Sequence, residues 1–285
     1  MTFEIYRNRV DDYLNTLLTR QNALNESMRY SVLAGGKRFR PILTYTTASL
    51  FDVEPRQVDA CAAAIELIHI YSLIHDDLPA MDDDDMRHNQ SSSHKIFGEG
   101  QAILVGDGLQ ALAFEVLSGA ENIMPGTRIK LLNLLASSAF DMADGQSIDL
   151  SVVSMNIDVD FLNSLHLKKT GALLDCAVKF GALLVEPQID NKDIDILSLF
   201  SEKIGLAYQI QDDVLDVLGS DESLGKRQNS DLKKGKPTYP SVIGIEKSSK
   251  AYKDLYEEGI EELGELSRNA GALINLTNKI MHRDY

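Results

Sequence analysis

Apolar residues recur at helical spacing in nearly every segment of this chain of 285 residues. One such series is Ile129, Leu132, Leu135, Ala136 and Ala139. Positions three and four residues apart share one face of an α-helix, whereas the alternation that is typical of a half-buried strand is scarce here. The pattern therefore predicts an all-α fold. No break in it divides domains convincingly, so we expect a single domain over residues 1–285.

A dense acidic cluster follows one of the longest apolar runs. Six aspartates fall within residues 76–85, directly after the apolar run 61–74. Like charges at this density repel one another and resist loss of water, so the cluster favours bound cations. Pro79 would break the helix and let Asp82 turn back toward Asp76 and Asp77, whereas an unbroken helix would rotate Asp82 about 240° away from Asp76. The cluster predicts a divalent metal site, although an isolated acidic run is more often solvated surface.

A second acidic cluster lies at Asp212, Asp213 and Asp216, again within apolar sequence. At about 100° per residue, Asp212 and Asp216 are one turn apart on one helical face, with Asp213 on the flank of that face. Two carboxylate patches that face each other would suit Mg²⁺, because this hard ion prefers oxygen ligands and commonly bridges to phosphate oxygens. The two clusters together predict a phosphorylated substrate.

Composition limits the classes of partner. Hydrophobic residues make up 44% of the chain, enough for a sizeable core, and the net charge is −15 with a pI near 4.8. An acidic balance of this size argues against a general affinity for nucleic acid or for anionic membranes. Residues 1–12 lack the apolar stretch of a secretion signal, and Cys61 and Cys176 lie in apolar sequence with no metal or disulfide spacing. We expect a soluble, cytoplasmic protein with two core cysteines.

The segment 219–237 differs from the rest of the chain. It is polar, punctuated by glycine and rich in lysine, and it comes directly after the second aspartate cluster. A loop of this length inside a compact domain is uncommon unless it is functional or disordered. We expect it to fold over a bound anion as a basic lid.

Further short motifs occur in a fixed order along nearly the whole chain. Besides the two aspartate clusters they are Gly35-Gly36-Lys37-Arg38-Phe39-Arg40-Pro41, His69, Phe97-Gly98-Glu99, Gly106-Asp107, Gly145-Gln146, Lys169-Thr170-Gly171-Ala172, Gln209-Ile210-Gln211, Leu224-Gly225-Lys226-Arg227 and Lys236-Pro237-Thr238-Tyr239-Pro240. With this ordered set the chain resembles the trans-isoprenyl diphosphate synthases, most closely the bacterial farnesyl diphosphate synthase type. The resemblance implies a helical bundle of the isoprenoid synthase type around a deep central cavity.

The resemblance also implies roles for individual residues. The metal ligands would be six aspartates that hold three Mg²⁺ ions per active site: Asp76, Asp77, Asp82, Asp212, Asp213 and Asp216. The residues that neutralise the allylic diphosphate would be Arg87, Lys169, Lys226 and Lys236, and those that seat isopentenyl diphosphate would be Lys37, Arg40 and His69. Thr170, Gln209 and the Lys169 carbonyl would face the allylic cation.

By the same resemblance the chain is a prenyltransferase that forms a homodimer and condenses isopentenyl diphosphate with dimethylallyl or geranyl diphosphate to give farnesyl diphosphate. An aromatic residue at Tyr71, shortly before the first cluster, would stop the growing chain. Helix counting alone places Ser72 below Asp76, so the role of Tyr71 depends on the resemblance. Without the neighbouring motif a lone tyrosine is equally well explained by core packing.

The chain departs from the family pattern after the first cluster. The family has two arginines, a glycine and a proline two positions on, where this chain reads Arg87-His88-Asn89-Gln90-Ser91. Histidine at position 88 is mostly neutral at pH 7 and has fewer donors than arginine, which weakens the expected isopentenyl diphosphate site. We also expect a looser loop here. Asp144 replaces the usual glycine before Gly145.

Several alternatives stay open at this point. A synthase that makes geranyl or geranylgeranyl diphosphate shares these motifs, and His88 also permits a non-catalytic prenyl synthase-like subunit. The pair His75-Asp76 is superficially that of the helical metal phosphohydrolases, with His69 and His94 as further ligands, but this leaves the second cluster without a role. Terpene cyclases have aspartate-rich helices without a second diphosphate site. We expect His94, His166 and His282 to lie on the surface or in loops.

Overall fold

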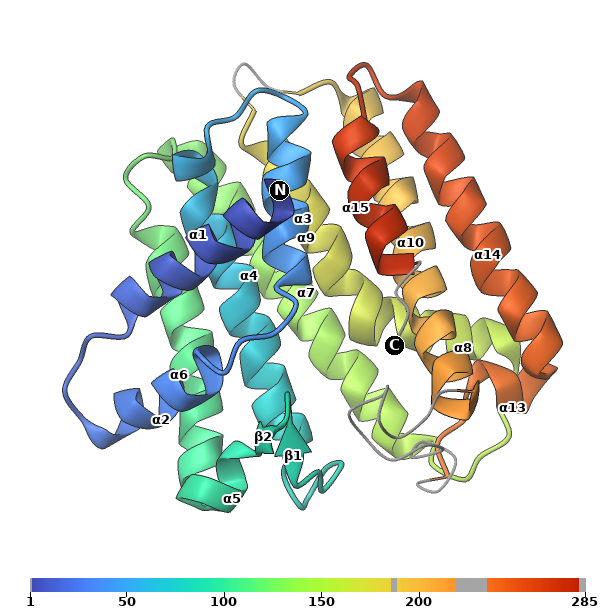
Figure 1. The fold of residues 1–285 in the computed structure, drawn as a ribbon, viewed down its shortest axis with the longest axis horizontal. Coiled ribbons are helices and arrows are strands. Elements are labelled where there is room, and N and C mark those ends of the chain that lie inside the picture. Colours follow the sequence, from blue (N-terminus) through green and yellow to red (C-terminus); the bar gives the residue numbers. More distant parts are fainter. Residues whose placement is uncertain (1, 186–188, 219–234, 282–285) are drawn as a thin grey trace. The chain divides into compact units, whose positions relative to one another are not determined.

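The computed structural model describes residues 2–185, 189–218 and 235–281. These residues form helices with one small antiparallel hairpin, so the prediction of an all-α fold is confirmed (Figure 1). They divide into two compact units, residues 1–135 with 183–185 and residues 136–182 with 186–285, and each unit is described separately.

The first unit is built around helix α4 (Pro55–Asp76). This helix is apolar around its whole circumference, as expected of a helix buried on all sides, and its residues from Cys61 to Ile65 are fully buried. It packs along α6 (Glu99–Ser118) and against α3 (Phe39–Ser49), and Figure 1 shows α4 and α6 side by side. The remaining elements of this unit are α1 (Thr2–Leu17), α2 (Ala23–Val32), β1 (Met86–Arg87), β2 (Gln90–Ser91) and α5 (Ser93–Phe97).

Helix α4 is long and apolar enough to cross a membrane by length and composition, the single such helix among the described residues. Its apolar window is 72% buried inside the protein, and Asp59 and Glu66 interrupt it. Burial of this extent is what the central helix of a globular core requires. Cys61 on this helix is buried, as is Cys176 in the second unit, so the prediction of two core cysteines is confirmed.

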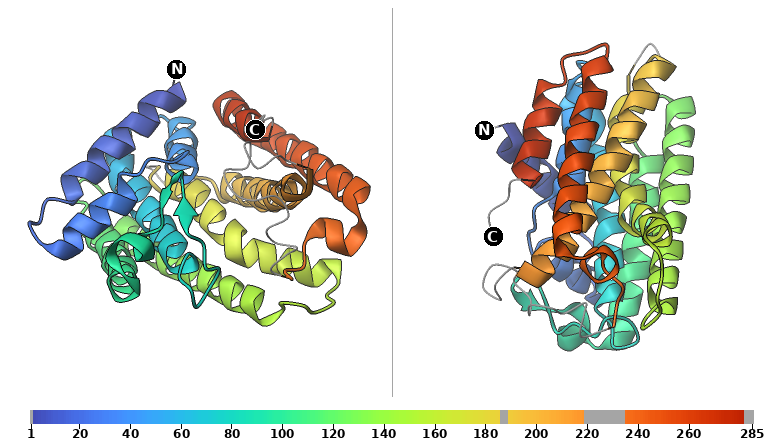
Figure 2. Two further views of the ribbon diagram at one scale, coloured as in Figure 1. Left: turned by 60° about the horizontal axis from the view of Figure 1, so that its bottom comes forward. Right: turned by 90° about the vertical axis from the view of Figure 1, so that its right-hand side faces the viewer.

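The second unit contains a long helix, α10 (Asn191–Leu218), with α14 (Ile245–Glu262) lying along it in Figure 1 and in the right view of Figure 2. Its other elements are α7 (Pro125–Ser151) from residue 136, α8 (Val159–His166), the π-helical segment η1 (Leu167–Gly171), α9 (Ala172–Leu183), α13 (Tyr239–Ile243), the 3₁₀ segment η2 (Leu263–Glu265) and α15 (Gly271–Met281). Leu162, Leu206, Ile210 and Tyr239 form an apolar cluster that joins α8, α10 and α13.

Candidate active site

The first aspartate cluster begins where helix α4 ends. Asp76 is the last residue of this helix, and the chain then turns so that the backbone N–H of Asp82 donates to the carbonyl of Asp76 at 2.8 Å. The N–H of Asp84 likewise donates to the carbonyl of Asp77 at 3.2 Å. The helix thus ends before Pro79 and Asp82 returns to Asp76, so the prediction from Pro79 is confirmed.

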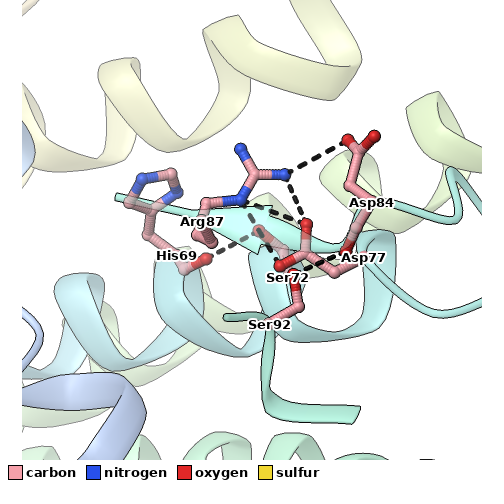
Figure 3. A network of polar contacts seen from close by, with 6 residues as sticks. All are labelled: His69, Ser72, Asp77, Asp84, Arg87 and Ser92. Atoms are coloured by element: carbon pink, nitrogen blue, oxygen red, sulfur yellow. Dashed lines mark hydrogen bonds and ion pairs between the residues drawn. The ribbon is translucent and has the colours of Figure 1, made fainter. Parts of the chain in front are cut away.

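The carboxylate of Asp77 is buried and held by Arg87. Its Oδ1 accepts from Nη2 of Arg87 at 2.5 Å and from Nε at 3.1 Å, and Asp84 lies 3.7 Å from the same guanidinium. Figure 3 shows the guanidinium of Arg87 between these two carboxylates. Burial raises the pKa of Asp77, and Arg87 opposes the shift. Asp77 therefore fixes Arg87 in this structure, whereas the carboxylates of Asp76 and Asp82 are half-buried and closer to solvent.

Positively charged side chains surround His69 on helix α4. Burial, together with the charges of Arg40, Arg87 and Arg38, lowers the pKa of His69 well below its usual value. The structure thus brings together His69, Arg40 and Arg87, three of the residues expected to bind diphosphate. A group of this kind attracts an anion, because a bound negative charge offsets the repulsion among its members.

Arg38 was missed as a functional residue by sequence reasoning. It is buried, with its Nη1 donating to Glu66 at 2.9 Å and its Nε to Asp11 at 2.8 Å. Its backbone is left-handed, with φ of 48°, at the start of helix α3. These contacts fix the turn that exposes Lys37 and the first turn of α3, which carries Arg40. The sequence could have indicated Arg38, because it lies in the glycine-rich motif between Lys37 and Arg40, which were both predicted to bind diphosphate.

The segment after the first cluster is a tight hairpin, so the expectation of a looser loop was wrong. Strands β1 and β2 pair in antiparallel register, and His88 and Asn89 form the two-residue turn with φ of 51° and 62°. Positive φ at both positions matches the turns that favour asparagine and glycine, so asparagine replaces the family's glycine at small cost. The ring of His88 lies 3.4 Å from the position that a Cβ on Gly36 would take.

His94 and His166 are buried, so the expectation that they lie on the surface was wrong; His282 lies outside the described residues. The ring of His166 stacks on the ring of Tyr239 at 5.9 Å within the second unit. His75 contacts the carbonyl of Ile103 at 3.1 Å through Nε2. A carbonyl can only accept, so Nε2 carries the proton in this contact, and Nδ1 is the ring nitrogen that could bind a metal in the phosphohydrolase alternative.

The second aspartate cluster lies near the end of helix α10. Asp212 is half-buried, whereas Asp213 and Asp216 are buried. The carboxylate of Asp213 accepts from the backbone N–H of Tyr239 at 3.0 Å and from Nε2 of Gln209 at 3.2 Å, and His166 lies 3.3 Å away. Asp213 is therefore fixed by its own unit, and Asp212 is the more accessible carboxylate of the cluster.

Lys169 and Thr170 lie in the π-helical segment η1. Such segments are rare and are found frequently at functional sites. The hydroxyl of Thr170 donates to Oε1 of Gln209 at 2.9 Å, and the amide of Gln209 donates in turn to Asp213. The two residues expected to face the allylic cation are therefore hydrogen-bonded to each other and, through Gln209, to the second aspartate cluster.

Asp149 is a second residue that sequence reasoning missed. Its Oδ2 accepts from Nζ of Lys169 at 2.7 Å and lies 3.0 Å from Nζ of Lys236. Burial would raise the pKa of Asp149, but the two ammonium groups outweigh it and lower this pKa. One carboxylate thus gathers two of the lysines expected to bind diphosphate and leaves a net positive charge. Lys226 and most of the predicted lid lie outside the described residues.

The departure at Asp144 has a local explanation. Its carboxylate lies 2.5 Å from Nζ of Lys168, which neighbours Lys169 in η1. Both side chains are exposed, and an exposed pair of this kind contributes little to stability because solvent screens it. Asp144 therefore adds a surface ion pair and does not disturb the ion pair between Lys169 and Asp149.

Tyr71 lies on helix α4, buried against the helix's own next turn and α6. Its ring meets the ring of His75 edge-on at 5.7 Å, and its hydroxyl neighbours Gln110 of α6. Ser72 is half-buried and its hydroxyl donates to the carbonyl of His69 at 2.8 Å. Of the two candidates for chain-length control, Tyr71 is thus the bulky packed side chain, and Ser72 is bonded within its helix.

The chain matches the model of one protein family, polyprenyl synthetase, over residues 21–273. It is 44% identical over 266 residues to a farnesyl diphosphate synthase of Escherichia coli, which covers 91% of this chain and 89% of the relative. It is 41% identical to a geranylgeranyl diphosphate synthase of Cyanophora paradoxa, covering 96% of this chain and 93% of the relative. A crystal structure of a geranyltransferase from Legionella pneumophila superposes with a TM-score of 0.88 at 33% identity, covering 99% and 96% of the two chains. The chain therefore belongs to the polyprenyl synthetase family.

Proposed function

We propose that this chain is a magnesium-dependent prenyltransferase that condenses isopentenyl diphosphate, head to tail, with dimethylallyl or geranyl diphosphate to give farnesyl diphosphate. The observation that supports this most directly is the group of cations around His69 beside the aspartate loop at the end of α4. The first unit thus offers an anion site next to a carboxylate site, as two diphosphate substrates and a metal require. Similarity to curated farnesyl diphosphate synthases adds support.

The aspartates fit magnesium by the chemistry of their donors. Asp76 and Asp82 are half-buried carboxylates that a backbone hydrogen bond holds together, and Asp212 is the corresponding accessible carboxylate of α10. Hard oxygen donors with room for water are what Mg²⁺ prefers. Asp77 and Asp213 would orient Arg87 and Gln209, and Asp216 would complete the ligand set. Bound magnesium stabilises the charge that develops on the departing diphosphate.

The cationic residues of the chain would carry the remaining steps. Lys169 and Lys236, gathered on Asp149, would donate charge-assisted hydrogen bonds to the allylic diphosphate together with Arg87 and Lys226. Lys37, Arg40, His69 and His88 would seat the diphosphate of isopentenyl diphosphate. Thr170 and Gln209 would present oxygen atoms to the allylic cation, and the departing diphosphate would accept the proton that is lost.

Incubation with isopentenyl diphosphate and either dimethylallyl or geranyl diphosphate, followed by sizing of the products, tests the proposal. We expect farnesyl diphosphate as the main product with either allylic substrate, and no product once Mg²⁺ is chelated. Absence of magnesium-dependent elongation would defeat the proposal. The non-catalytic subunit would then be the better account.

A second candidate function is synthesis of geranylgeranyl diphosphate, because a synthase with that product is 41% identical to this chain. Overall sequence similarity therefore does not distinguish between a farnesyl and a geranylgeranyl diphosphate product. Sizing of the products also identifies a synthase that stops at geranyl diphosphate. Tyr71 is the residue on which we base the choice of farnesyl diphosphate.

Replacing Tyr71 by alanine is expected to shift the main product from farnesyl to geranylgeranyl diphosphate. Removal of the ring frees space beside α6 for a longer tail, at a cost of about 3–5 kcal/mol in stability if the ring is fully packed. Product sizing measures the shift, and Ser72→Ala, whose hydroxyl bonds within the helix, is the matched control. An unchanged product from Tyr71→Ala would remove Tyr71 from chain-length control.

His88→Arg is expected to lower the KM for isopentenyl diphosphate about tenfold, since a charge-assisted hydrogen bond contributes about 1.5–3 kcal/mol. Partial burial and the charges of Arg87 and Arg38 lower the pKa of His88, so its ring is uncharged at pH 7. As the pH falls through that pKa, the wild-type ring gains the charge that arginine carries at every pH. The ratio of wild-type to variant KM should therefore shrink toward one at acidic pH, and comparing the two proteins cancels titration of the substrate.

An equal KM for both proteins across the pH range would show that position 88 does not contact the substrate. A wild-type protein that binds but never condenses, even with arginine at position 88, would favour the non-catalytic subunit. We further propose that residues 1–285 act as one polyprenyl synthetase domain, that the enzyme is a homodimer, and that it works in the cytoplasm. Sedimentation of the purified protein tests the dimer.

A further inference from the structure

A group of three side chains next to the first aspartate loop takes no part in the proposed condensation. Asp83 and Asp85 are exposed at the end of the loop, and His94 is buried in the adjoining helix α5. One ligand atom of each residue, a carboxylate oxygen or a ring nitrogen, lies within 4.8 Å of the others. None of the three is among the aspartates to which the proposed function gives a role, namely Asp76, Asp77, Asp82, Asp212, Asp213 and Asp216.

The ring of His94 is the observation that points to a ligand. Its residue is 6% exposed, and neither Nδ1 nor Nε2 has a hydrogen-bond partner among the residues that the structure describes. A buried polar group without a partner costs free energy, and buried groups of this kind commonly contact water or an ion. Since one ring nitrogen lies near the carboxylates of Asp83 and Asp85, the ion would be a cation.

The backbone holds the two parts of the group together. The N–H of Ser92 donates to the carbonyl of Asp85 at 2.9 Å, and its hydroxyl donates to the carbonyl of Asp84 at 2.5 Å. The loop with the two carboxylates is therefore tied to the residue that precedes α5. Because Asp83 and Asp85 are exposed, small rotations of their side chains can place all three ligand atoms at about 2.0–2.2 Å from one shared ion, the length of zinc bonds to nitrogen and oxygen.

We propose that Asp83, Asp85 and His94 bind a divalent transition-metal ion, with Zn²⁺ as the best fit, at a site separate from the magnesium aspartates. Imidazole nitrogen favours zinc and its neighbours over magnesium, and two carboxylates neutralise the charge of the ion. Three protein ligands leave a position for water. The ion joins the loop that carries Asp82 to helix α5 and so stabilises the loop.

Replacement of Lys95 should raise the zinc affinity, whereas replacement of a ligand should lower it. Its Nζ lies 2.7 Å from Asp85, and both side chains are largely exposed, so this ion pair contributes little. A metal at Asp85 competes with Lys95 for the same carboxylate. Replacement of Lys95 by methionine therefore increases zinc affinity if Asp85 is a ligand, whereas loss of a ligand decreases it.

Calorimetric titration of the full chain with Zn²⁺ in an excess of Mg²⁺, which occupies the oxygen-only sites, measures the binding. We expect one zinc ion per chain, with affinity lost by about 100-fold or more in His94→Gln, since loss of a group that merely orients a ligand already costs about 10–100-fold. Asp83→Asn and Asp85→Asn should also weaken binding, and Lys95→Met should strengthen it. Glu99→Gln removes a nearby exposed carboxylate outside the group and should leave the affinity unchanged.

Cobalt supplies a second readout, because Co²⁺ bound to nitrogen at low coordination number absorbs more strongly in the visible range than Co²⁺ in an all-oxygen site. The band should appear in the wild type and in Lys95→Met and be absent in His94→Gln. Because His94 is buried, circular dichroism checks that His94→Gln folds. If it does not fold, the zinc affinities of the variants at the exposed residues Asp83, Asp85 and Lys95 test the proposal. No zinc binding in excess Mg²⁺, or affinity indifferent to Asp83 and Lys95, would overturn the proposal and leave water as the partner of His94.

Discussion

Asp82→Asn is expected to lower kcat/KM for the condensation about 10³-fold while leaving the fold intact. Removal of one group that stabilises developing charge in a transition state commonly costs about 10²–10³-fold. Loss of a carboxylate that also binds the metal belongs at the upper end of that range. The backbone bond from Asp82 to the carbonyl of Asp76 does not involve the side chain, so asparagine preserves the loop.

The measurement is steady-state kinetics over a range of Mg²⁺ concentrations. The variant should require more Mg²⁺ for half-maximal rate, because asparagine offers a neutral oxygen in place of a charged one. Asp83→Asn, assayed with Mg²⁺ as the sole divalent metal, is the matched control, since Asp83 is the next residue, is exposed and lies outside the magnesium group. An equal loss of kcat/KM in the two variants would indicate a general effect of negative charge around the loop and would exclude Asp82 as a specific magnesium ligand.

The fold and the aspartate loop were accessible from the sequence for physical reasons. Helical periodicity is a local signal, and the apolar run before Asp76 predicts a helix that is buried on all sides, as α4 is. Pro79 constrains its own backbone, so it predicted the break that lets Asp82 return. The residues around His69 needed the family resemblance, because motif order and not periodicity connects Arg40 with Arg87.

What the sequence could not supply depends on contacts between distant segments. Asp149 looks like any acidic position of a helix, and its role appears when Lys169 and Lys236 converge on it. The burial of His94 and His166 likewise depends on what packs against them. The hairpin at His88 was the clearest error, because asparagine was read as a loose-loop residue although it adopts the left-handed backbone that the turn needs.

Gly145 is a motif residue whose role is packing, because the backbone of Lys169 lies directly against it. A Cβ on Gly145 would lie 2.4 Å from the backbone nitrogen of Lys169 and 2.6 Å from its Cα. The atoms in contact are backbone, which cannot rotate away as a side chain can. Helix α7 and the segment η1 therefore approach so closely that glycine alone fits at this position. One turn further along α7 lies Asp149, which binds the side chain of Lys169.

Gly145→Ala is expected to destabilise the protein by about 1–3 kcal/mol, because overpacking outweighs the about 1 kcal/mol that alanine gains in helix propensity. It should also lower kcat about 100-fold, because displacement of η1 moves Lys169 and Thr170, and a misplacement of about 1 Å can cost that much. Urea unfolding and steady-state kinetics measure the two effects.

Gly126→Ala in the same helix is the control, since a Cβ there meets no atom within 4 Å. It should leave the free energy of unfolding and kcat nearly unchanged or raise stability slightly. The comparison separates packing from helix propensity, because both variants add the same methyl group to α7. If Gly145→Ala were as stable and active as Gly126→Ala, the close approach of α7 and η1 would not be what positions Lys169, and Asp149 alone would have to hold the lysine in place.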